Sequence, residues 1–176
     1  HYQEAIKGAY PALDKLRSEG VIKAVSAGMN QWEMLADFAR AGDFDCFLLA
    51  GRYSLLDQGA LDELLPLCLE KNIGIMAGGT YNSGILAKGA SAGAKFNYQD
   101  APPEIINKAQ SLEAVAQRHQ VNIKAAASLF ALAHPAITTI IPGTRNPDRV
   151  NENFGLLNED IPTAFWQELR AEKLIH

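Results

Sequence analysis

Residues 44–51 read FDCFLLAG and residues 72–79 read NIGIMAGG, two short apolar runs that each end in glycine. Runs of this length and composition are typical of buried strands. Between them, residues 61–69 carry apolar side chains at helical spacing, although Pro66 predicts a kink or a helix start displaced towards it. A strand, a helix and a second strand in this order predict a right-handed crossover in a parallel sheet.

The same alternation continues on both sides of this unit. We expect, in chain order, a helix over residues 2–18 closed by Gly20, a strand over 21–27, a helix ending near Gly42, a strand over 44–50, a helix over 61–69, a strand over 72–77, helices over 104–119 and 123–133, a strand over 137–141, a helix from Asn146 and a helix over 163–173. Asn30 with Glu33 predicts a capping box, and Asn122 and Asn146 are predicted helix caps. The sequence therefore predicts the α/β class.

The chain has 176 residues, 48% of them apolar, and a formal charge of −4. This length supports one hydrophobic core, so residues 1–176 are predicted to form a single domain. The acidic balance argues against a nucleic-acid partner, and no run approaches the roughly 20 apolar residues of a membrane span. We therefore expect a cytoplasmic protein without a membrane partner.

Cys46 and Cys68 lie in apolar patterns without metal-ligand spacing, which predicts two buried free thiols and no metal site.

Glycine lies at or just after the end of each predicted strand, at Gly28, Gly51, Gly78-Gly79 and Gly143. These positions share the carboxyl edge of a parallel sheet, where both barrels and open α/β sheets bind ligands. The fingerprints of dinucleotide and phosphate loops are missing, because the glycines at 79 and 84 are followed by Ile85 and Leu86. A complete eight-stranded barrel needs roughly 200–250 residues or more. The pattern alone leaves an open flavodoxin-like sheet and part of a barrel as alternatives.

Four blocks stand at the predicted strand ends: GMNQ at residues 28–31, LAGRYSLL at 49–56, YNSGIL at 81–86, and IPGTR at 141–145, which continues to Asn153. Together, and in this order, they resemble the aldo-keto reductases, and within that family the sugar dehydrogenase branch. The resemblance implies a (β/α)8 TIM barrel of which residues 1–176 form the C-terminal half, with about four strand–helix units. It also implies an oxidoreductase that binds NAD or NADP and oxidises an aldose such as L-fucose to its lactone by hydride transfer.

The resemblance assigns one group of residues to the nicotinamide and the pyrophosphate of the cofactor. These residues are Gly28, Met29, Thr80, Tyr81, Asn82, Ser83 and Gly84. The first two stand where many members of the family hold the nicotinamide amide, and one of the next two would lie against the nicotinamide. The last three match a turn that covers the pyrophosphate, where small residues let backbone N–H groups approach anionic oxygens.

A second group is implied to hold the adenosine end of the cofactor. It consists of Pro142, Gly143, Thr144, Arg145, Arg149 and Asn153. These residues surround a predicted helix start, where exposed N–H groups and the helix dipole stabilise an anion. Gly143 replaces a lysine that NADP-preferring members often carry, so we expect either NAD or NADP to bind. By themselves, Arg145 and Arg149 would also fit a solvated helix face paired with Asp148 and Glu152.

No residue of this chain is assigned a catalytic role. The catalytic Asp, Tyr, Lys and His of the family lie in the first half of the barrel and have no counterpart here. The resemblance therefore implies that the parent protein acts on a small sugar or aldehyde, whereas this chain alone is inactive. The alternative is a nucleotide-binding or interaction module without catalysis. The uncovered edges of half a barrel also predict self-association.

Overall fold

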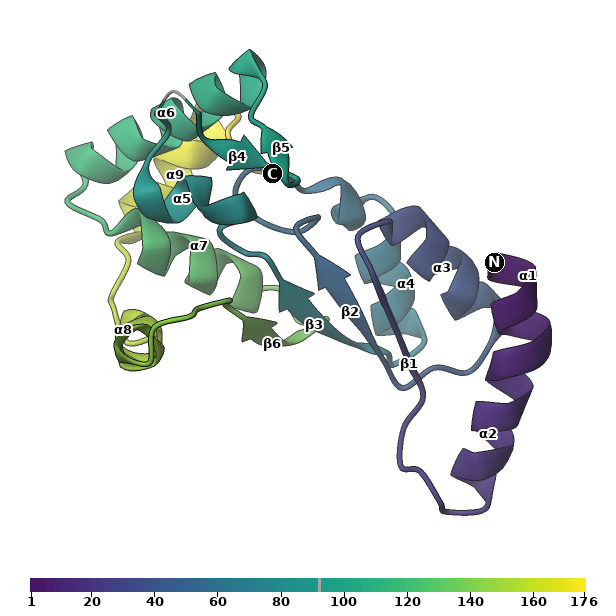
Figure 1. The fold of residues 1–176 in the computed structure, drawn as a ribbon. Coiled ribbons are helices and arrows are strands. Elements are labelled where there is room, and N and C mark those ends of the chain that lie inside the picture. Colours follow the sequence, from purple (N-terminus) through teal and green to yellow (C-terminus); the bar gives the residue numbers. More distant parts are fainter. Residues whose placement is uncertain (92) are drawn as a thin grey trace.

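The computed structural model describes residues 1–91 and 93–176, and its centre is a parallel sheet of four strands (Figure 1). The strands lie in the order β1 (Ser26–Met29), β2 (Cys46–Ala50), β3 (Gly74–Gly78) and β6 (Ile137–Ile141). A register shift between Ile75 and Met76 interrupts the pairing of β3 with β6. The strand order follows the chain without a reversal, and the parallel pairing confirms the predicted α/β class.

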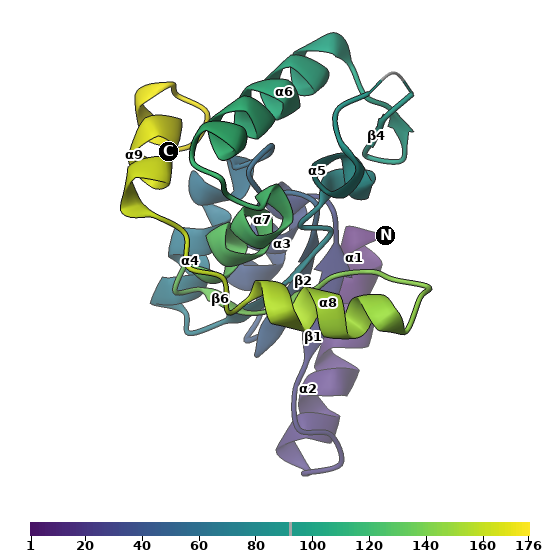
Figure 2. The ribbon, with the colours of Figure 1, turned by 90° about the vertical axis from the view of Figure 1, so that its left-hand side faces the viewer.

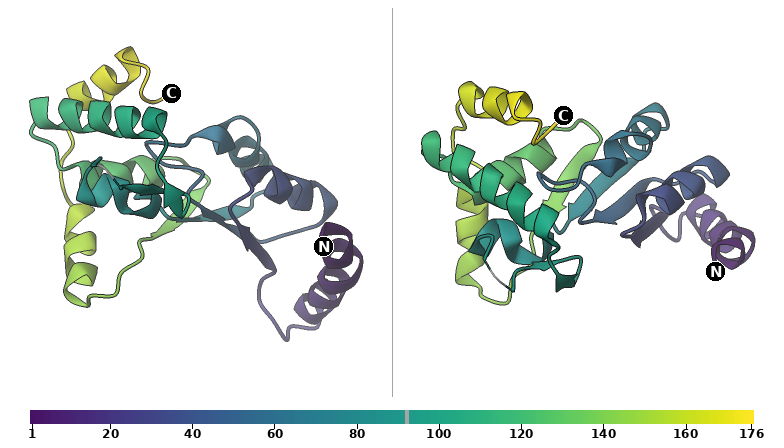
Figure 3. Two further views of the ribbon diagram at one scale, coloured as in Figure 1. Left: turned by 45° about the horizontal axis from the view of Figure 1, so that its top comes forward. Right: turned by 90° about the horizontal axis from the view of Figure 1, so that it is seen from above.

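Helices surround this sheet unevenly. The helical elements are α1 (Tyr2–Glu4), a π-helical turn (Ala5–Ala9), α2 (Tyr10–Ser18), α3 (Trp32–Ala41), a 3₁₀ turn (Gly59–Leu61), α4 (Leu64–Glu70), a 3₁₀ turn (Asn82–Gly84), α5 (Ile85–Lys88), α6 (Pro103–Arg118), α7 (Ile123–Leu132), α8 (Asp148–Leu156) and α9 (Thr163–Ala171). An antiparallel hairpin, β4 (Lys95–Phe96) and β5 (Gln99–Asp100), lies between α5 and α6 in the chain. Helices α1 and α2 lie beyond β1, whereas α5 to α9 gather on the side of β6 (Figure 1, Figure 3). Within the described ranges, no helix combines the length and the apolar character needed to cross a membrane.

Two hydrophobic cores hold these layers together. The first core packs the sheet against α3 and α4, and Leu35, Phe47 and Leu64 are fully buried in it. The second core joins α5, α6, α7 and α9 around Phe165. Phe130 of α7 packs against both cores. Helix α7 therefore connects the sheet to the helices that lie beyond β6.

The two faces of the sheet are covered to different extents. Phe47 is buried in the first core, whereas Cys46, Leu48 and Ala50 on the opposite face of β2 are only half-buried. Because side chains alternate between the faces of a strand, this pattern leaves one face of the sheet partly open.

Both cysteines are free, and burial raises the pKa of the Cys68 thiol to about 12. The predicted burial is confirmed for Cys68 and wrong for Cys46, because Cys46 lies on the open face.

The first strand is shorter than the sequence predicts. β1 begins at Ser26 and not at Val21, whose side chain is 67% exposed. Pairing with β2 starts only at Ser26, and the preceding Val25 N–H donates to the Asp45 carboxylate (2.6 Å). Gly28 therefore lies inside the strand and does not end it. All of residues 21–27 favour a strand, but only the residues from Ser26 onward pair with β2. Pairing with β2 therefore sets the start of β1.

Helix starts agree with the sequence at several places and differ at one. Helix α4 begins at residue 64, so Pro66 falls in its first turn, which confirms the displaced start. The side-chain oxygen of Asn122 accepts the N–H two residues further on (3.1 Å), which confirms the cap of α7. The predicted capping box of Asn30 and Glu33 is wrong. Helix α3 has Gln31 at its N-cap, without a side-chain hydrogen bond to the helix.

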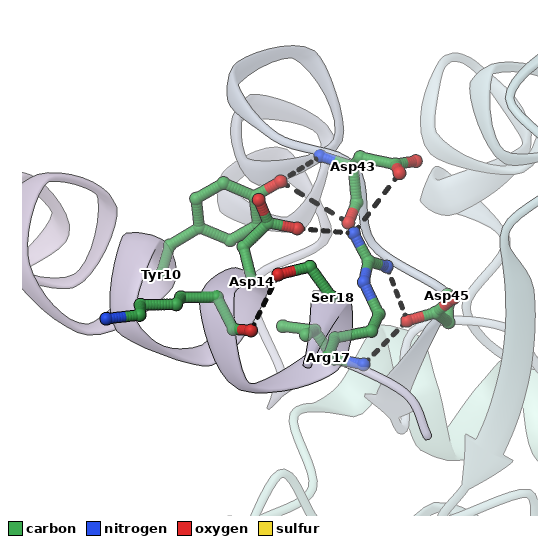
Figure 4. A network of polar contacts seen from close by, with 8 residues as sticks. Tyr10, Asp14, Arg17, Ser18, Asp43 and Asp45 are labelled. Atoms are coloured by element: carbon green, nitrogen blue, oxygen red, sulfur yellow. Dashed lines mark hydrogen bonds and ion pairs between the residues drawn. The ribbon is translucent and has the colours of Figure 1, made fainter. Parts of the chain in front are cut away.

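A polar network fastens α2 to the amino edge of the sheet (Figure 4). The Arg17 guanidinium donates to Asp14 (2.7 Å), Asp45 (2.7 Å) and Asp43 (3.2 Å). The N–H of Val25 and the guanidinium of Arg17 lower the pKa of the Asp45 carboxyl. The charges of this network are paired with one another. The network lies at the opposite edge of the sheet from the carboxyl edge, where glycines mark the strand ends.

Candidate functional site

A cavity of about 1040 Å³ opens at the carboxyl edge of the sheet. The segments that follow β1, β2, β3 and β6 all contribute to its wall, together with the tip of the β4–β5 hairpin, α5, the start of α7, and α8. Parallel α/β sheets bind their ligands at this edge, because the loops from successive strands converge there. The cavity is therefore the candidate site.

The turn over residues 79–84 forms the inner wall, and its backbone is tightly constrained. Gly79 has a φ of +65°, and a Cβ in its place would lie 3.1 Å from the backbone nitrogen of Gly51. That N–H of Gly51 donates to the carbonyl of Gly78 (2.8 Å), which joins the ends of β2 and β3. Asn82 and Ser83 also have positive φ angles, of 44° and 57°. Such conformations persist where the surrounding structure imposes them, which is frequent at functional sites.

Two buried oxygens in this turn have no hydrogen-bond partner among the described residues. They are Thr80 Oγ1 and Asn82 Oδ1, on side chains that are fully or almost fully buried. The other amide atom of Asn82, Nδ2, donates to the Gly51 carbonyl (3.2 Å), which fixes the orientation of this side chain. A buried polar atom without a partner costs about 1–3 kcal/mol. A polar ligand in the adjoining cavity would offset that cost.

The β4–β5 hairpin reaches the cavity through its tip. Asn97 and Tyr98 form the tip with positive φ at both positions, which is the conformation of a tight hairpin turn. The N–H of Tyr98 donates to Ser83 Oγ (3.2 Å), so the hairpin is tied to the buried turn. Both tip residues line the cavity, and the Tyr98 side chain is 81% exposed. The hairpin thus extends the wall outward from residues 79–84.

The outer wall consists of the segment after β6 and helix α8. Asn146 Oδ1 accepts the N–H of Asp148 (2.9 Å), although α8 begins at Asp148 with Pro147 as its N-cap, one residue later than predicted. Thr144 Oγ1 donates to the Asn146 carbonyl (3.1 Å). Residues 142–153 are exposed almost throughout. Helix α8 lies beside α7 and contacts it (Figure 2). Lys124 at the start of α7 forms an ion pair with Glu152 of α8. The two walls therefore differ in burial, although they enclose the same cavity.

The charges around the cavity favour an anionic ligand. Four lining residues are cationic, Lys88, Lys124, Arg145 and Arg149, and the acidic lining residue is Glu152. The hydrogen bond from Lys124 lowers the pKa of the Glu152 carboxyl, and the positive charges of Lys124 and Arg149 lower it further. Among the described residues, the other three cations form no salt bridge. Their charge is available to a ligand.

The structure brings together most of the residues that the resemblance assigns to a cofactor. Those that line the cavity are Thr80, Tyr81, Asn82, Ser83, Gly84, Pro142, Gly143, Thr144, Arg145, Arg149 and Asn153. Gly28 and Met29 do not line it. They lie in β1, where a Cβ on Gly28 would be 3.3 Å from the Leu48 side chain, and the next residue, Asn30, reaches the wall. The contacts of all these residues with a cofactor stay predictions.

The sequence does not predict five of the lining residues: Ala87, Lys88, Asn97, Tyr98 and Lys124. Asn97 indicates the hairpin turn in the sequence, because Asn is frequent where both turn residues need positive φ. A signal also existed for Lys124, since it follows the predicted cap Asn122 and so stands at a helix start. Lys88 ends α5, a helix of four residues that is too short to give a periodic pattern.

The titratable side chains that line the cavity belong to lysine, arginine, tyrosine and glutamate, and histidine is not among them. His119 contacts Glu168 of α9, and His134 packs beside Tyr53, where burial lowers the pKa of the imidazole. Neither histidine lines the cavity. In the part of the chain that the structure describes, no group of three or more His, Cys, Asp or Glu could hold a metal ion.

Comparison with known proteins gives consistent results at the level of family and fold. The aldo/keto reductase family model matches residues 1–173. The chain is 41% identical over 168 residues to a pyridoxal 4-dehydrogenase from Microbacterium luteolum, covering 96% of this chain and 49% of that protein. It is 34% identical over 172 residues to a D-threo-aldose 1-dehydrogenase from a Pseudomonas species, covering 97% of this chain and 52% of that protein. The chain thus spans about half the length of these relatives.

Solved structures agree in fold. An aldo-keto reductase from Bacillus halodurans, in its holo form, superposes with a TM-score of 0.73 at 18% identity, covering 97% of this chain and 56% of that chain. A glycerol dehydrogenase from Gluconobacter oxydans superposes with a TM-score of 0.66 at 15% identity, covering 94% of this chain and 53% of that chain. At this identity the likeness concerns the fold alone.

Proposed function

The chain belongs to the aldo/keto reductase family, and from this premise we propose that it forms the cofactor-binding, C-terminal half of a (β/α)8 barrel. In the complete protein, a bound NAD or NADP would supply the hydride acceptor for the oxidation of an aldose resembling L-fucose to its lactone. The cavity at the carboxyl edge is the proposed cofactor site. The observation that carries this proposal is the buried turn at residues 79–84, which has two oxygens without a hydrogen-bond partner among the described residues. The same turn lines a cavity that also holds four cationic side chains.

Three features of the sheet support the half-barrel part of the proposal. The strand order follows the chain, whereas doubly wound sheets reverse their order at a switch point. One face packs on α3 and α4, while Leu48 and Met76 on the other face are half-buried, as expected for a barrel interior that lacks its far side. Strands β1 and β6 each have one neighbour. We propose that further strands of the full protein pair with both edges, and that this chain alone self-associates through them.

The groups around the cavity fit a dinucleotide. Thr80 Oγ1 and Asn82 Oδ1 can accept hydrogen bonds from an amide or from sugar hydroxyls close to the sheet. Arg145 and Arg149 carry charge suited to phosphate groups, which guanidinium binds with two parallel hydrogen bonds. Gly143 contributes no cation at the start of this segment. We therefore expect similar affinities for NAD and NADP.

In this proposal the residues of the chain bind and orient the cofactor, which itself supplies the hydride acceptor. The turn at residues 79–84 is fixed by backbone packing before binding, so little conformational entropy is lost there on binding. The acid–base residues that move the substrate proton are proposed to lie outside this chain, consistent with the positions of His119 and His134 away from the cavity. We therefore expect no dehydrogenase activity from residues 1–176 with L-fucose and NAD.

We propose a substrate class that is broader than L-fucose alone. Two of the relatives are named for pyridoxal and for a D-threo-aldose. We infer a small sugar or aldehyde for the complete protein. The pocket for it would also depend on loops that precede residue 1 in the family.

A titration of intrinsic protein and cofactor fluorescence tests the cofactor site. NADH and NADPH are added separately to the chain and to Arg149→Ala, with Arg170→Ala as a matched control on α9. We expect saturable binding to the chain, about 10-fold weaker binding to Arg149→Ala because a charge-assisted hydrogen bond is lost, and unchanged binding to Arg170→Ala. An Arg149→Ala variant that binds as tightly as the unmodified chain would remove Arg149 from the site. Absence of saturable binding by the chain itself would overturn the proposal.

The second candidate function is a nucleotide-binding or interaction module without catalysis, in keeping with a cavity whose lining holds four cations and no histidine. Co-expression with the N-terminal half of the Microbacterium luteolum relative separates the two candidates. Restored dehydrogenase activity would support the half-enzyme, whereas a soluble complex that binds NADH without turnover would support the module.

A further inference from the structure

Helix α8 carries Arg149 and Asn153, yet few contacts hold it in place. Leu156 is its one buried residue, while Val150 and Phe154 are 57% and 72% exposed. Lys124 of α7 forms an ion pair with Glu152, which fixes one point of the helix. A single ion pair at the surface contributes little by itself. The orientation of α8 over the cavity therefore depends on whatever else it contacts.

The other polar contact of α8 comes from the buried turn. The Tyr81 hydroxyl lies 3.0 Å from Ser128 Oγ on α7 and donates to Asn153 Oδ1 on α8 (3.5 Å). In the shorter pair, between Tyr81 and Ser128, either hydroxyl can donate. Ser128 is 1% exposed, so the core of α7 fixes this partner of Tyr81.

The contact with Tyr81 involves the carbonyl oxygen of the Asn153 amide. Its carbonyl oxygen is taken up by the Tyr81 hydroxyl, and Asn153 lines the cavity. The amide N–H groups are then available to acceptors on a ligand. Without the hydroxyl of Tyr81, the amide could rotate and present its oxygen instead. The resemblance placed either Thr80 or Tyr81 against the nicotinamide, whereas the hydroxyl of Tyr81 is directed to the helix assigned to the adenosine.

We propose that Tyr81 is a positioning residue for the adenosine end of the ligand, acting through Asn153. This inference rests on the proposed function, because the ligand it concerns is the adenosine phosphate part of NAD or NADP. The hydroxyl orients the Asn153 amide and joins α8 to the turn at residues 79–84 before the ligand arrives. Ordering these groups in advance lowers the entropy cost of binding.

Binding of cofactor fragments separates this role from a contact with the nicotinamide. AMP and nicotinamide mononucleotide are titrated against the chain, Tyr81→Phe, Asn153→Ala and the double variant. We expect Tyr81→Phe to bind AMP about 3- to 10-fold more weakly, the range for one neutral hydrogen bond, and to bind nicotinamide mononucleotide as the unmodified chain does. In the Asn153→Ala background, Tyr81→Phe should have no further effect. Tyr2→Phe, which removes a hydroxyl bonded to the Asp37 carbonyl far from the cavity, is the matched control.

Two results would overturn the proposal while leaving the proposed function intact. One is weaker binding of nicotinamide mononucleotide, with AMP unchanged, in Tyr81→Phe. The other is an undiminished effect of Tyr81→Phe in the Asn153→Ala background. If the unmodified chain binds neither NADH nor NADPH, the proposed function fails instead.

Hydrogen exchange of α8 then tests the positioning without any ligand. Tyr81→Phe should speed exchange of the α8 amides several-fold and leave α3 unchanged. Equal exchange in both proteins would refute the positioning on its own.

Discussion

The two walls of the cavity come from segments of opposite character. The turn at residues 79–84 is buried, with Thr80 fully covered and the backbone of Gly79 packed against Gly51. The segment at residues 142–147 and most of α8 are exposed, and α8 contacts α7. One wall is therefore determined by the fold itself, and the other by a small number of side-chain contacts. Local stability is expected to differ accordingly, because it follows the number of buried contacts.

The largest difference between the walls should appear in glycine substitutions. Gly79→Ala places a side chain at a φ of +65° and 3.1 Å from a backbone nitrogen that cannot move freely. We expect a loss of about 3 kcal/mol of unfolding free energy, from left-handed strain and overpacking together. Gly143→Ala, where nothing lies within 4 Å, should change stability by less than about 0.5 kcal/mol. Urea denaturation of both variants measures the contrast, and similar losses at both positions would contradict it.

Within α8 itself, the buried and exposed apolar residues should also differ. Leu156→Ala removes the one buried side chain of the helix and should cost about 2 kcal/mol, the low end for leucine because a helix end can relax. Val150→Ala, at a position 57% exposed, should be nearly neutral. Hydrogen-exchange protection of residues 148–156 is the suitable measurement, since the loss is expected to be local. Equal protection in both variants would show that α8 is held by contacts other than Leu156.

The sequence predicts the bounds of those elements that depend only on residues close by in the chain. Strand 137–141 has the bounds of β6, and Asn122 caps α7 as its residue type indicates. The start of β1 could not be predicted in this way, because it depends on where β2 begins. The glycine-marked strand ends located the cavity correctly, whereas Gly28 itself packs against Leu48 and lies outside the wall.

The direction of the Tyr81 hydroxyl could not be predicted from the sequence. The family resemblance placed this residue in the right loop but left open whether it or Thr80 meets the nicotinamide. Its partners, Ser128 and Asn153, lie 47 and 72 residues further along the chain. Spacing within one loop carries no information on contacts between such distant segments. The same applies to Lys124 and Glu152, which meet only because α8 packs on α7.

The smallest expected effect concerns the ion pair that holds the exposed wall. Lys124 lowers the pKa of the Glu152 carboxyl in the folded chain. A carboxyl with a lowered folded pKa adds stability above its unfolded pKa, and this stability is lost as the pH falls through the folded pKa. Protection of the α8 amides, corrected for intrinsic exchange rates, should therefore decrease as the pH is lowered through the acid range below 4.5. The decrease should be smaller in Glu152→Gln and in high salt, because the pair is exposed and screened. Protection of residues 79–84 should not follow the same curve, and an identical pH dependence for both walls would mean that α8 does not respond to Glu152 separately from the fold.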